Sequence, residues 1–421
     1  ENGADVVLYD GNEKLTEADV RAKLQEGSKA RIIIGAFPEE LPNTLDLVIL
    51  SPGVPTDLPI ILKMKEKEIP VIGEVELAYT FGKGDVLAIT GTNGKTTTKE
   101  LLAAVLSTKF NLLYTEGNFN NHIGVPLTLL RLTHDHELAV IEMGASHPGD
   151  IKELVDIVHP NYGIITNVGR AHLEGFGSFE GVIRTKGELY DYIRRSKGKI
   201  FIKKENEYLQ SIAKGIEQIT YGNGDDAFAS GQVVSCDPFL VFNWKQQGKL
   251  HTVETHMIGS YNLDNVLAAV AVGRFFKIPA ERISRAIAAY EPTNNRSQFK
   301  KTENNELIID AYNANPSSMK VALDNFITMP VQPKAIILGD MRELGPTSDE
   351  LHAEVVEQIK KGQFDKVFLC GEHFSKVGKE FSPFATTEAM TEELRRQPLK
   401  GYHILIKGSH SMGLEKLADI L

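Results

Sequence analysis

Cysteine is scarce in this sequence, which holds only two among 421 residues. Cys236 and Cys370 lie far apart in the chain and no CxxC pair exists, which excludes a zinc site built on paired cysteines. We expect two free thiols and a reducing compartment. Long apolar runs are also missing, because neither a stretch of 18 apolar residues nor a signal peptide is visible. We therefore expect no membrane span and a cytoplasmic location.

Basic residues do not outnumber acidic ones: 46 lysines and arginines stand against 56 aspartates and glutamates, and the net charge is −10. This balance argues against a nucleic-acid partner, because such partners require a strong basic field. Local lysines, backbone amides and a metal ion would have to bind any phosphate. The composition, 42% hydrophobic and 24% charged, is ordinary for a globular protein, and the length predicts about three domains. We place them at residues 1–82, 83–293 and 294–421.

One stretch carries a strong signal, VLAITGTNGKTTTKE at residues 86–100. Its first four residues predict a short buried strand, a glycine-bearing turn follows, and residues 99–106 predict a helix. The backbone amides of such a loop point at a phosphate, while Lys95 adds positive charge and a threonine hydroxyl after it can bind Mg²⁺. A full P-loop has a glycine where Ile89 stands, so this loop is a shortened variant. The alternative is a glycine-rich turn that only starts a helix.

Residues 1–82 alternate short apolar strands with helical segments, a pattern that predicts a parallel, doubly wound sheet. Ligands of such sheets bind at the carboxyl ends of the strands. This rule makes Asp10, Ser51 and Gly53 candidate ligand contacts, although all three residue types are also common in plain turns. A dinucleotide-type fold usually has a strand and a glycine loop before an acid such as Asp10. Neither is present in the sequence, so we expect the first domain to be incomplete.

The predicted central domain has an asparagine-rich loop, GNFNNHIGVP at 117–126, with candidate contacts at Asn118, Asn120, Asn121 and His122. Its uncharged amides suit a sugar or a diphosphate, but the same residues also favour tight turns. A buried strand further along the chain carries a lone Glu142. A carboxylate beside a phosphate loop commonly holds Mg²⁺, and an unpaired glutamate in the core is otherwise costly.

Three further features of this domain are ambiguous on their own. His172 follows a strand and is either a metal ligand or a capping group. Lys186 lies among apolar neighbours in a predicted helix, which usually indicates a lysine with a buried stem and an ammonium that reaches solvent. Asn262 and Asn265, three residues apart, share one face of the first turn of another helix.

The predicted third domain consists of strands that each end in a polar cluster. LIID at 307–310 leads to AYNANPSS, KAIIL at 334–338 leads to GDMRELG, and YHILI at 402–406 leads to KGSHS. Polar clusters at one sheet edge indicate a doubly wound domain with a ligand site. The expected fold class is α/β in three domains: a Rossmann-like N-terminal domain, a central parallel sheet of the P-loop ATPase type with a small β-rich elaboration, and a C-terminal Rossmann-like domain.

Taken together, these stretches resemble the Mur ligases of peptidoglycan synthesis. The resemblance is carried by TGTNGKTTT at 90–98, Glu142, AHLEGFGS at 171–178, Lys186 in TKGE, GSYNLDN at 259–265, DAYNANPSSM at 310–319, LGDMRELG at 338–345 and KGSHS at 407–411. Within the family, residues 86–421 look like the branch that adds D-alanyl-D-alanine to a UDP-muramoyl tripeptide. Residues 1–80, especially LSPGVP and IPVIGEVELAY, look like the branch that adds D-glutamate. The resemblance implies a hybrid, natural or engineered, whose two parts join near the phosphate loop.

The family reaction implied by this resemblance is ATP-dependent amide formation. The carboxylate of a UDP-MurNAc-peptide takes the γ-phosphoryl group of ATP, and the amine of D-Ala-D-Ala then attacks the acyl phosphate. The resemblance also implies two Mg²⁺ ions, with a carbamate on Lys186 that supports the second of them. The expected partners are these small molecules, with no nucleic acid and no membrane span, and a monomer is expected.

The family motifs imply a role for each candidate residue. The implied catalytic residues are Lys95, Lys186, His172 and Arg296. The implied ATP contacts are Gly91, Thr92, Asn93, Gly94, Lys95, Thr96, Thr97, Asn262, Arg296 and Asp310. The implied metal ligands are Thr96, Thr97, Glu142, His172 and Lys186. The implied substrate contacts are Asp10, Ser51, Gly53, Asn118, Asn120, Asn121, His122, Tyr312, Asn313, Asn315, Lys407 and Ser409.

Other interpretations remain open at this point. A D-glutamate-adding ligase is favoured by the first domain but not by the third, which should select the incoming amine. A folylpolyglutamate synthase shares the ATP core, but LSPGVP and GNFNNHIGVP speak against it. A hybrid that binds ATP without full ligase activity is the alternative from another class. Arg296, taken alone, is also compatible with an ordinary surface arginine.

Overall fold

The computed structural model describes residues 4–51, 54–74, 76–77, 84–293 and 296–421. The chain divides into two compact units, Glu1–Thr80 and Phe81–Leu421, and each is described by itself. Gly53, a predicted substrate contact, lies outside the described residues. Among the helices of the described ranges, none is long and apolar enough to cross a membrane.

The first unit is built from short elements. They are β1 (Val7–Asp10), α1 (Glu17–Arg21), β2 (Arg31–Ile34), η1 (Leu41–Thr44), β3 (Val48–Leu50), α2 (Pro59–Glu66) and β4 (Val71–Gly73). The strands form two separate parallel pairs, β1 with β2 and β3 with β4, where the sequence predicts one continuous sheet. The buried residues described in this unit, Leu41, Pro42, Ile61 and Met64, all lie outside the strands. Strands of three or four residues without a buried side chain have little apolar surface to hold a wider sheet together.

The second unit begins with a large sheet and its helices, which we call the central part (residues 84–293). Its elements are β5 (Asp85–Thr90), α4 (Lys95–Leu106), β6 (Leu112–Tyr114), α5 (Gly124–Leu129), β7 (Leu138–Glu142), α6 (Asp150–Val158), β8 (Tyr162–Ile165), α7 (Leu173–Phe176), α8 (Phe179–Arg195), β9 (Lys199–Lys203), α9 (Glu207–Ile212), β10 (Glu217–Gly222), β11 (Ala229–Cys236), β12 (Phe239–Gln246), β13 (Lys249–Ile258), η2 (Ser260–Asn262), α10 (Leu263–Phe275) and α11 (Ala280–Ala288). The strand order is β13-β12-β11-β10-β9-β8-β5-β7-β6. Strands β5 to β11 pair in parallel, and β12 and β13 continue the same sheet in antiparallel fashion. The predicted β-rich elaboration is therefore an extension of the central sheet.

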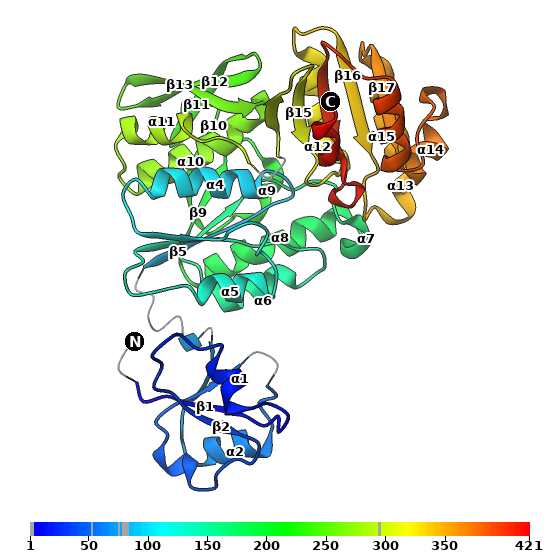
Figure 1. Ribbon diagram of the computed structural model, residues 1–421. Helices are drawn as coiled ribbons and strands as arrows, with labels where there is room; N and C mark the ends of the chain where they lie inside the picture. Colours follow the sequence, from blue (N-terminus) through cyan, green and yellow to red (C-terminus); the bar gives the residue numbers. More distant parts are fainter. Residues whose placement is uncertain (1–3, 52–53, 75, 78–83, 294–295) are drawn as a thin grey trace. The chain divides into compact units, whose positions relative to one another are not determined.

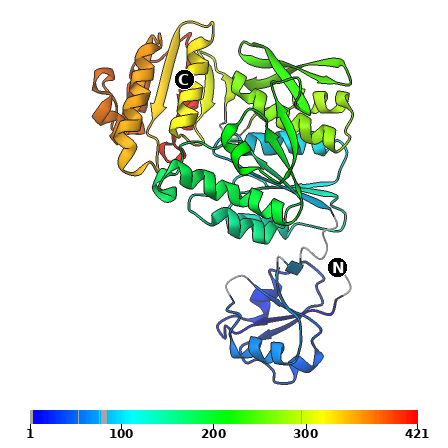
Figure 2. The same ribbon diagram turned by 180° about the vertical axis from the view of Figure 1, so that it is seen from behind.

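Helices cover both faces of the central sheet. Figures 1 and 2 show α4, α10 and α11 on one face and α5, α6 and α8 on the other. The first face is sealed by one apolar cluster that includes Leu87, Ile89 and Val140 from the strands and Leu101 and Val105 from α4. Helix α10 is buried along most of its length, as expected of a helix that is apolar all round. This double cover leaves the carboxyl ends of the parallel strands as the place where polar side chains can gather.

The remaining elements form a second sheet, which we call the C-terminal part (residues 296–421). They are β14 (Gln298–Lys301), β15 (Glu306–Asp310), α12 (Pro316–Thr328), β16 (Lys334–Gly339), η3 (Gly345–Thr347), α13 (Ser348–Lys361), β17 (Lys366–Cys370), α14 (Glu372–Val377), η4 (Lys379–Phe381), α15 (Thr387–Arg396), β18 (His403–Lys407), η5 (His410–Met412) and η6 (Leu414–Asp419). The order is β14-β15-β18-β16-β17, with only the edge strand β14 antiparallel. Ile308 and Ile336 pack in one cluster with α12 and α13, whereas Leu307 and Ile337 pack in another with α15. The predicted α/β fold class is confirmed.

Helix α4 begins at Lys95, four residues earlier than the sequence suggests. Gly94 is its N-cap, with a left-handed backbone (φ +75°) that turns the chain directly into the helix. Threonines are poor helix formers, but in a first turn their N–H groups need no partner within the helix. The early start therefore leaves the N–H groups of Lys95, Thr96 and Thr97 available to a ligand. The two cysteines are free thiols, as predicted.

Candidate active site

The second unit contains a cavity of about 1050 Å³ that gathers most of the predicted site residues. The predicted residues that line it are Thr92, Asn93, Gly94, Lys95, Thr96, Thr97, Asn118, Asn120, Asn121, His122, Glu142, His172, Asn262, Arg296, Asp310, Tyr312, Asn313, Asn315 and Lys407. They come from both the central and the C-terminal part, from loops and from the ends of strands and helices. A volume of this size accommodates ligands larger than a mononucleotide.

The loop after β5 is held by close backbone approaches. Gly91 has φ +149°, and a Cβ atom placed there would lie 1.9 Å from Oγ1 of Thr166. The Thr166 hydroxyl donates to the carbonyl of Asn93 (2.6 Å). Asn167 accepts from the Asn93 amide (2.9 Å) and donates to its carbonyl (3.0 Å). The loop is thus fixed from the end of β8 before any ligand binds.

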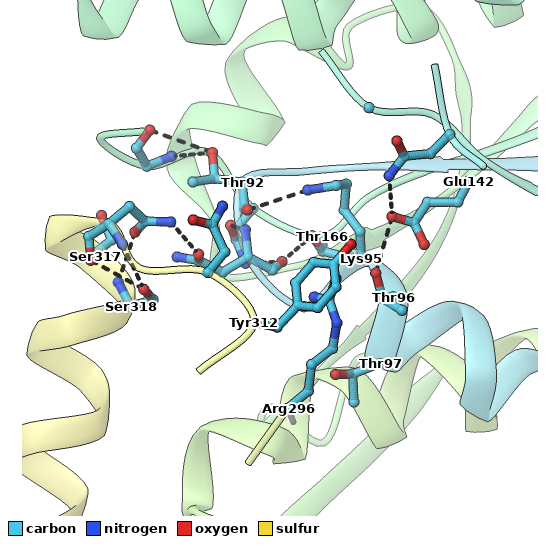
Figure 3. Close-up of a pocket in the computed structure, with 18 of the residues that line it drawn as sticks. Thr92, Lys95, Thr96, Thr97, Glu142, Thr166, Arg296, Tyr312, Ser317 and Ser318 are labelled. Atoms are coloured by element: carbon cyan, nitrogen blue, oxygen red, sulfur yellow. Dashed lines mark hydrogen bonds between the residues drawn. The ribbon is translucent and has the colours of Figure 1, made fainter. Parts of the chain in front are cut away.

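Lys95, Thr96 and Glu142 converge at the start of α4 (Figure 3). The Thr96 hydroxyl donates to Oε1 of Glu142 (3.1 Å), and the side-chain amide of Asn120 donates to the same oxygen (2.9 Å). Glu142 is only 1% exposed, and its Oε2 is buried without a hydrogen-bond partner among the described residues. A buried carboxylate oxygen without a partner is costly unless a cation or a donor meets it. The site therefore has a ready anionic ligand beside the helix N-terminus.

Lys95 is half-buried and donates weakly to the Thr92 carbonyl (3.4 Å). Burial lowers the pKa of its ammonium, Glu142 opposes that shift, and the like charge of Arg296 adds to it. An anion between Lys95 and Arg296 would remove this repulsion. The pair therefore favours a phosphate group at this position.

The asparagines of the loop at 117–126 have different hydrogen-bond partners. Asn120 faces Glu142, whereas the side chain of Asn121 accepts from the backbone amides of Ile123 and Gly124 and fixes the turn into α5. Asn118 and His122 line the cavity. The turn-forming role is therefore shown for Asn121, whereas ligand contact by this loop stays a prediction.

Asn262 and Asn265 form a chain of amides beside the loop. Asn265 donates to Oδ1 of Asn262 (2.7 Å), and Asn262 donates to the carbonyl of Ile258 (2.8 Å). Oδ1 of Asn265 accepts from the Thr98 hydroxyl (3.1 Å). The shared helix face predicted for the two asparagines is confirmed, and their amides support the helix that carries the phosphate loop.

Arg296 and Tyr312 come from the C-terminal part and lie together in Figure 3. The guanidinium carbon of Arg296 is 3.8 Å from the centre of the Tyr312 ring, and its Nε is buried without a hydrogen-bond partner in the described chain. Asp310 accepts from Nζ of Lys407 (2.6 Å), and Lys407 is buried. Asp310 and Lys407 thus neutralise each other at the cavity wall, while Arg296 keeps its charge for a ligand.

Asn315 and Ser317 join the C-terminal part to the phosphate loop and to the loop after β8, respectively. The side-chain amide of Asn315 donates to Oδ1 of Asn93 (2.9 Å), while its own oxygen caps α12. The hydroxyl of Ser317 accepts from the backbone amide of Arg170 (3.2 Å). These bonds hold the C-terminal part against the loops of the central part that line the cavity.

His172 and Lys186 are placed differently from each other. His172 lines the cavity with φ +50°, and its Nδ1 contacts the carboxylate of Glu343. Burial lowers its pKa, and Glu343 opposes that shift. Lys186 is 3% exposed, does not line the cavity, and has neither a hydrogen bond nor an ion pair among the described residues; its Nζ is 5.8 Å from the centre of the Phe176 ring. The pKa of Lys186 lies well below its ordinary value, mainly because the ammonium is buried and secondly because of the like charge of Lys95.

Other predicted contacts lie outside the cavity lining. Gly91 permits the close approach of the phosphate loop to Thr166. Ser409 is buried, and its hydroxyl accepts a hydrogen bond from the Arg342 amide (3.0 Å). In the first unit, Asp10 accepts from the amide of Asn12 (2.8 Å) and Ser51 donates to Glu74 (2.7 Å). The bond of Asp10 is a local one of the kind that turn residues make. The bond of Ser51 joins two segments of the first unit that lie 23 residues apart in the sequence.

Sequence reasoning missed several residues that shape the site. Thr166 and Asn167 hold the phosphate loop. The sequence feature that could have identified them is that they are two polar residues directly after the apolar strand β8. Glu343 lies in the quoted GDMRELG motif but was given no role of its own.

A cluster of three or more histidine, cysteine or acidic side chains that could hold a metal is not found among the described residues. A cation at Glu142 must therefore take most of its ligands from hydroxyls, water or the substrate itself.

Comparisons with known proteins agree with this geometry. The chain matches the model of the Mur ligase middle domain over residues 89–273 and that of the Mur ligase glutamate ligase domain over residues 295–410. The UDP-N-acetylmuramoyl-tripeptide--D-alanyl-D-alanine ligase of Bacillus subtilis is 34% identical, over 80% of this chain and 75% of its own. The UDP-N-acetylmuramoylalanine--D-glutamate ligase of Lachnoclostridium phytofermentans is 31% identical, over 80% and 72%. The MurF crystal structure from Acinetobacter baumannii has a TM-score of 0.74 at 30% identity and covers 82% of this chain and 78% of its own.

The fold and the site define an enzyme architecture in which a phosphate loop at a helix N-terminus faces a second, mainly parallel sheet across a shared cavity. The chain belongs to the Mur ligase family and is an enzyme of that family. The family membership predicted from the motifs is confirmed, and relatives of both predicted branches match the chain. The hybrid origin of residues 1–80 stays a prediction.

Proposed function

We propose that this enzyme uses ATP to join D-Ala-D-Ala to the terminal carboxylate of a UDP-MurNAc tripeptide. The observation that carries the proposal is the single cavity in which the phosphate loop, Glu142 and Arg296 meet residues of the DAYNANPSS motif. The D-Ala-D-Ala-adding relatives, at up to 34% identity, support this choice of substrates. The first 82 residues would bind the UDP moiety, residues 83–293 would bind ATP, and residues 294–421 would bind the incoming dipeptide.

The chemistry requires a carboxylate to become an electrophile. Phosphorylation by ATP converts its poor leaving oxygen into phosphate, and the amine of the dipeptide then displaces that phosphate. Two anions, the carboxylate and the γ-phosphate, must approach each other, so cationic groups between them lower the barrier. Lys95 of the central part and Arg296 of the C-terminal part both line the cavity and would supply such charge.

The phosphate loop would cradle the β- and γ-phosphates of ATP. The first-turn amides of α4 and the left-handed turn at Gly94 present N–H groups to an anion. Thr92, Asn93 and Gly94 line the cavity, whereas Gly91 acts indirectly by permitting the close approach to Thr166. Asn262 would face the adenine, with Arg296 and Asp310 closing over the nucleotide from the other side.

Mg²⁺ fits the donor set at Glu142. The unpartnered Oε2 of Glu142 and the hydroxyls of Thr96 and Thr97 are hard oxygen ligands of the type that Mg²⁺ prefers. When bound there, the ion would neutralise charge on the transferring phosphoryl group. A second ion would draw on His172, whose Nε2 has no partner among the described residues.

A carbamate on Lys186 belongs to the same proposal. The amine is buried and has neither a hydrogen bond nor an ion pair within the described part of the chain, and its lowered pKa favours the neutral form, which attacks CO₂ to give a carbamate and release a proton. If the carbamate supports the second metal, Lys186→Ala should lose activity and a small carboxylate should restore part of it. Enzyme labelled with carbon-13 bicarbonate should show a carbamate signal that Lys186→Ala lacks, and unchanged activity of that variant would reject the idea.

The incoming dipeptide would be held by the loop after β15. Tyr312, Asn313 and Asn315 line the cavity there, and their amide and hydroxyl groups suit the carboxylate and amide of D-Ala-D-Ala. Lys407 is neutralised by Asp310, so it would act on the dipeptide through that pair. Ser409 would act only through the Arg342 loop that it holds.

A D-glutamate-adding ligase is the second candidate. It is favoured by two relatives of that activity, each 31% identical over 80% of this chain. The two functions differ in both substrates, so one assay separates them. Phosphate release is measured with UDP-MurNAc tripeptide plus D-Ala-D-Ala, and separately with UDP-MurNAc-L-alanine plus D-glutamate. The proposal expects release with the first pair; release with only the second pair would replace it by the second candidate, and release with neither would leave an ATP-binding hybrid.

A further inference from the structure

A contact between His172 and Glu343 links the two halves of the active site. The residues are 171 positions apart, in the central and the C-terminal part, and the imidazole Nδ1 meets a carboxylate oxygen of Glu343. Both residues line the cavity. The side chain of Glu343 is 60% exposed, so burial does not force its carboxylate against the histidine. The contact must therefore be favoured by the positions of the two backbones.

Both backbones adopt the left-handed conformation at this contact. His172 has φ +50° and Glu343 has φ +61°. A residue other than glycine is uncommon in this region, and the surrounding structure must offset a cost on the order of 1 kcal/mol at each position. Two such residues that face each other indicate that the chain on both sides is shaped to bring these side chains together.

The loop that carries Glu343 is fixed by buried groups. The amide of Met341 donates to Nε2 of His352 (3.0 Å), and the amide of Arg342 donates to the hydroxyl of Ser409 (3.0 Å). His352 and Ser409 are both buried. The position of Glu343 is thus determined by the core of the C-terminal part, and Ser409 helps to hold the loop that carries it.

The contact determines which nitrogen of His172 faces the cavity. In a neutral imidazole one nitrogen donates and the other accepts, and the hydrogen bond of the first selects the tautomer. A carboxylate at Nδ1 selects the Nδ1–H form and leaves Nε2 with a lone pair. Nε2 of His172 has no hydrogen-bond partner among the described residues. An imidazole held in this way is a better ligand for a cation than one that rotates freely.

We infer that Glu343 is a positioning residue that reaches from the C-terminal part to hold His172 in the Nδ1–H tautomer, with Nε2 presented to the reacting phosphate and its cation. This inference rests on the proposed ligase function for its kinetic consequence, but not for the tautomer itself. Because the two residues belong to different parts, the tautomer is selected only when the C-terminal part meets the phosphate loop. His172 is therefore ready only when the site is assembled.

The first test reads the tautomer directly. Full-length protein labelled with nitrogen-15 histidine is compared by NMR with Glu343→Ala and with a matched control, Glu350→Ala. Glu350 is exposed in the first turn of α13, and its side chain makes no hydrogen bond among the described residues. We expect the wild type and the control to show His172 with a protonated Nδ1 and a bare Nε2, and Glu343→Ala to show a mixture of tautomers. His172→Gln identifies the signal, and an unchanged tautomer in Glu343→Ala would overturn the inference.

The second test reads the consequence for catalysis. In Glu343→Ala we expect kcat to fall and the Mg²⁺ concentration for half-maximal rate to rise, each on the order of 10–100-fold, with little change in the KM for ATP. Glu343→Gln keeps an acceptor oxygen and should recover part of the loss. Equal kinetics for Glu343→Ala and Glu350→Ala would overturn the role in catalysis. If the wild type releases no phosphate with either substrate pair, the proposed function fails, while the NMR comparison still decides the tautomer.

Discussion

The Thr96 hydroxyl donates to one oxygen of Glu142 at 3.1 Å and leaves the other oxygen buried and without a partner among the described residues. The same bonded oxygen also accepts from Asn120. One half of the carboxylate is therefore fixed by the protein, and the other half is oriented for a ligand that the protein does not supply.

Replacing Glu142 by glutamine should remove the anionic ligand while keeping the shape of the side chain. We expect the Mg²⁺ concentration for half-maximal phosphate release to rise on the order of 10–100-fold. Stability should be unchanged or higher, because the variant removes the charge of a buried carboxylate whose Oε2 has no partner among the described residues. A magnesium titration and a thermal melt measure the two effects. Equal magnesium dependence in the variant and the wild type would show that Glu142 holds no cation.

Lys95→Met should weaken ATP binding. A charged hydrogen bond to phosphate contributes about 1.5–3 kcal/mol, which corresponds to roughly 10–100-fold in the dissociation constant. Relief of the repulsion from Arg296 offsets part of this loss in the free enzyme. Calorimetry with a non-hydrolysable ATP analogue measures the affinity, and a matched Lys109→Met variant, remote from the cavity, is the control. An affinity equal to the control would remove Lys95 from the nucleotide site.

Asn315→Asp separates two roles of one side chain. The oxygen that caps α12 is kept, so the melting temperature should change little, whereas the donor to Asn93 is lost. A lost hydrogen bond of about 1 kcal/mol predicts roughly a fivefold fall in kcat/KM. Asn315→Ala should lose both the cap and the bond. A variant Asn315→Asp with full activity would mean that the contact between the two parts is not needed for turnover.

The buried His352 should make the free energy of unfolding depend on pH. Its Nε2 accepts from an amide and its Nδ1 faces the Ser348 carbonyl, so the folded protein holds it neutral, although Asp340, Asp349 and His373 surround it. Burial lowers its pKa from 6.5. Since the folded pKa is below the unfolded one, its stabilising contribution is complete above pH 6.5 and is lost as the pH falls toward the folded pKa.

Urea unfolding at a series of pH values measures this loss of stability. His352→Gln can keep both hydrogen bonds but does not titrate, so its free energy of unfolding should fall less steeply between pH 6.5 and the folded pKa. Parallel curves for the wild type and the variant would show that His352 is protonated equally in both states.

The phosphate loop could be predicted from the sequence because its signal is local. An apolar strand, a glycine turn and Lys95 lie within fifteen residues, and Glu142 stood out as a charge within an apolar strand. Arg296 and Asn315 could be named only through the family resemblance. The contact of Asn315 with Asn93 depends on how the two sheets meet, and that of Arg296 with Tyr312 depends on the pairing of β14 with β15. The contact of Glu343 with His172 spans 171 residues, and no local pattern encodes such a pair.

The first unit was predicted less well for a physical reason. Its alternating pattern gives the order of the strands, but strands of three or four residues carry too little apolar surface to determine how the pairs assemble. The burial of Ser409 was also missed, because a serine after a strand reads equally well as a ligand contact or as an anchor for a neighbouring loop.

The central claim is that ATP activates the carboxylate of a UDP-MurNAc tripeptide for attack by D-Ala-D-Ala. The most direct test uses tripeptide substrate whose terminal carboxylate carries oxygen-18, with the released phosphate and the product analysed by mass spectrometry. If an acyl phosphate forms, one labelled oxygen passes to inorganic phosphate for each amide bond made. Product without label in the phosphate, or label transfer only with UDP-MurNAc-L-alanine and D-glutamate, would contradict the account.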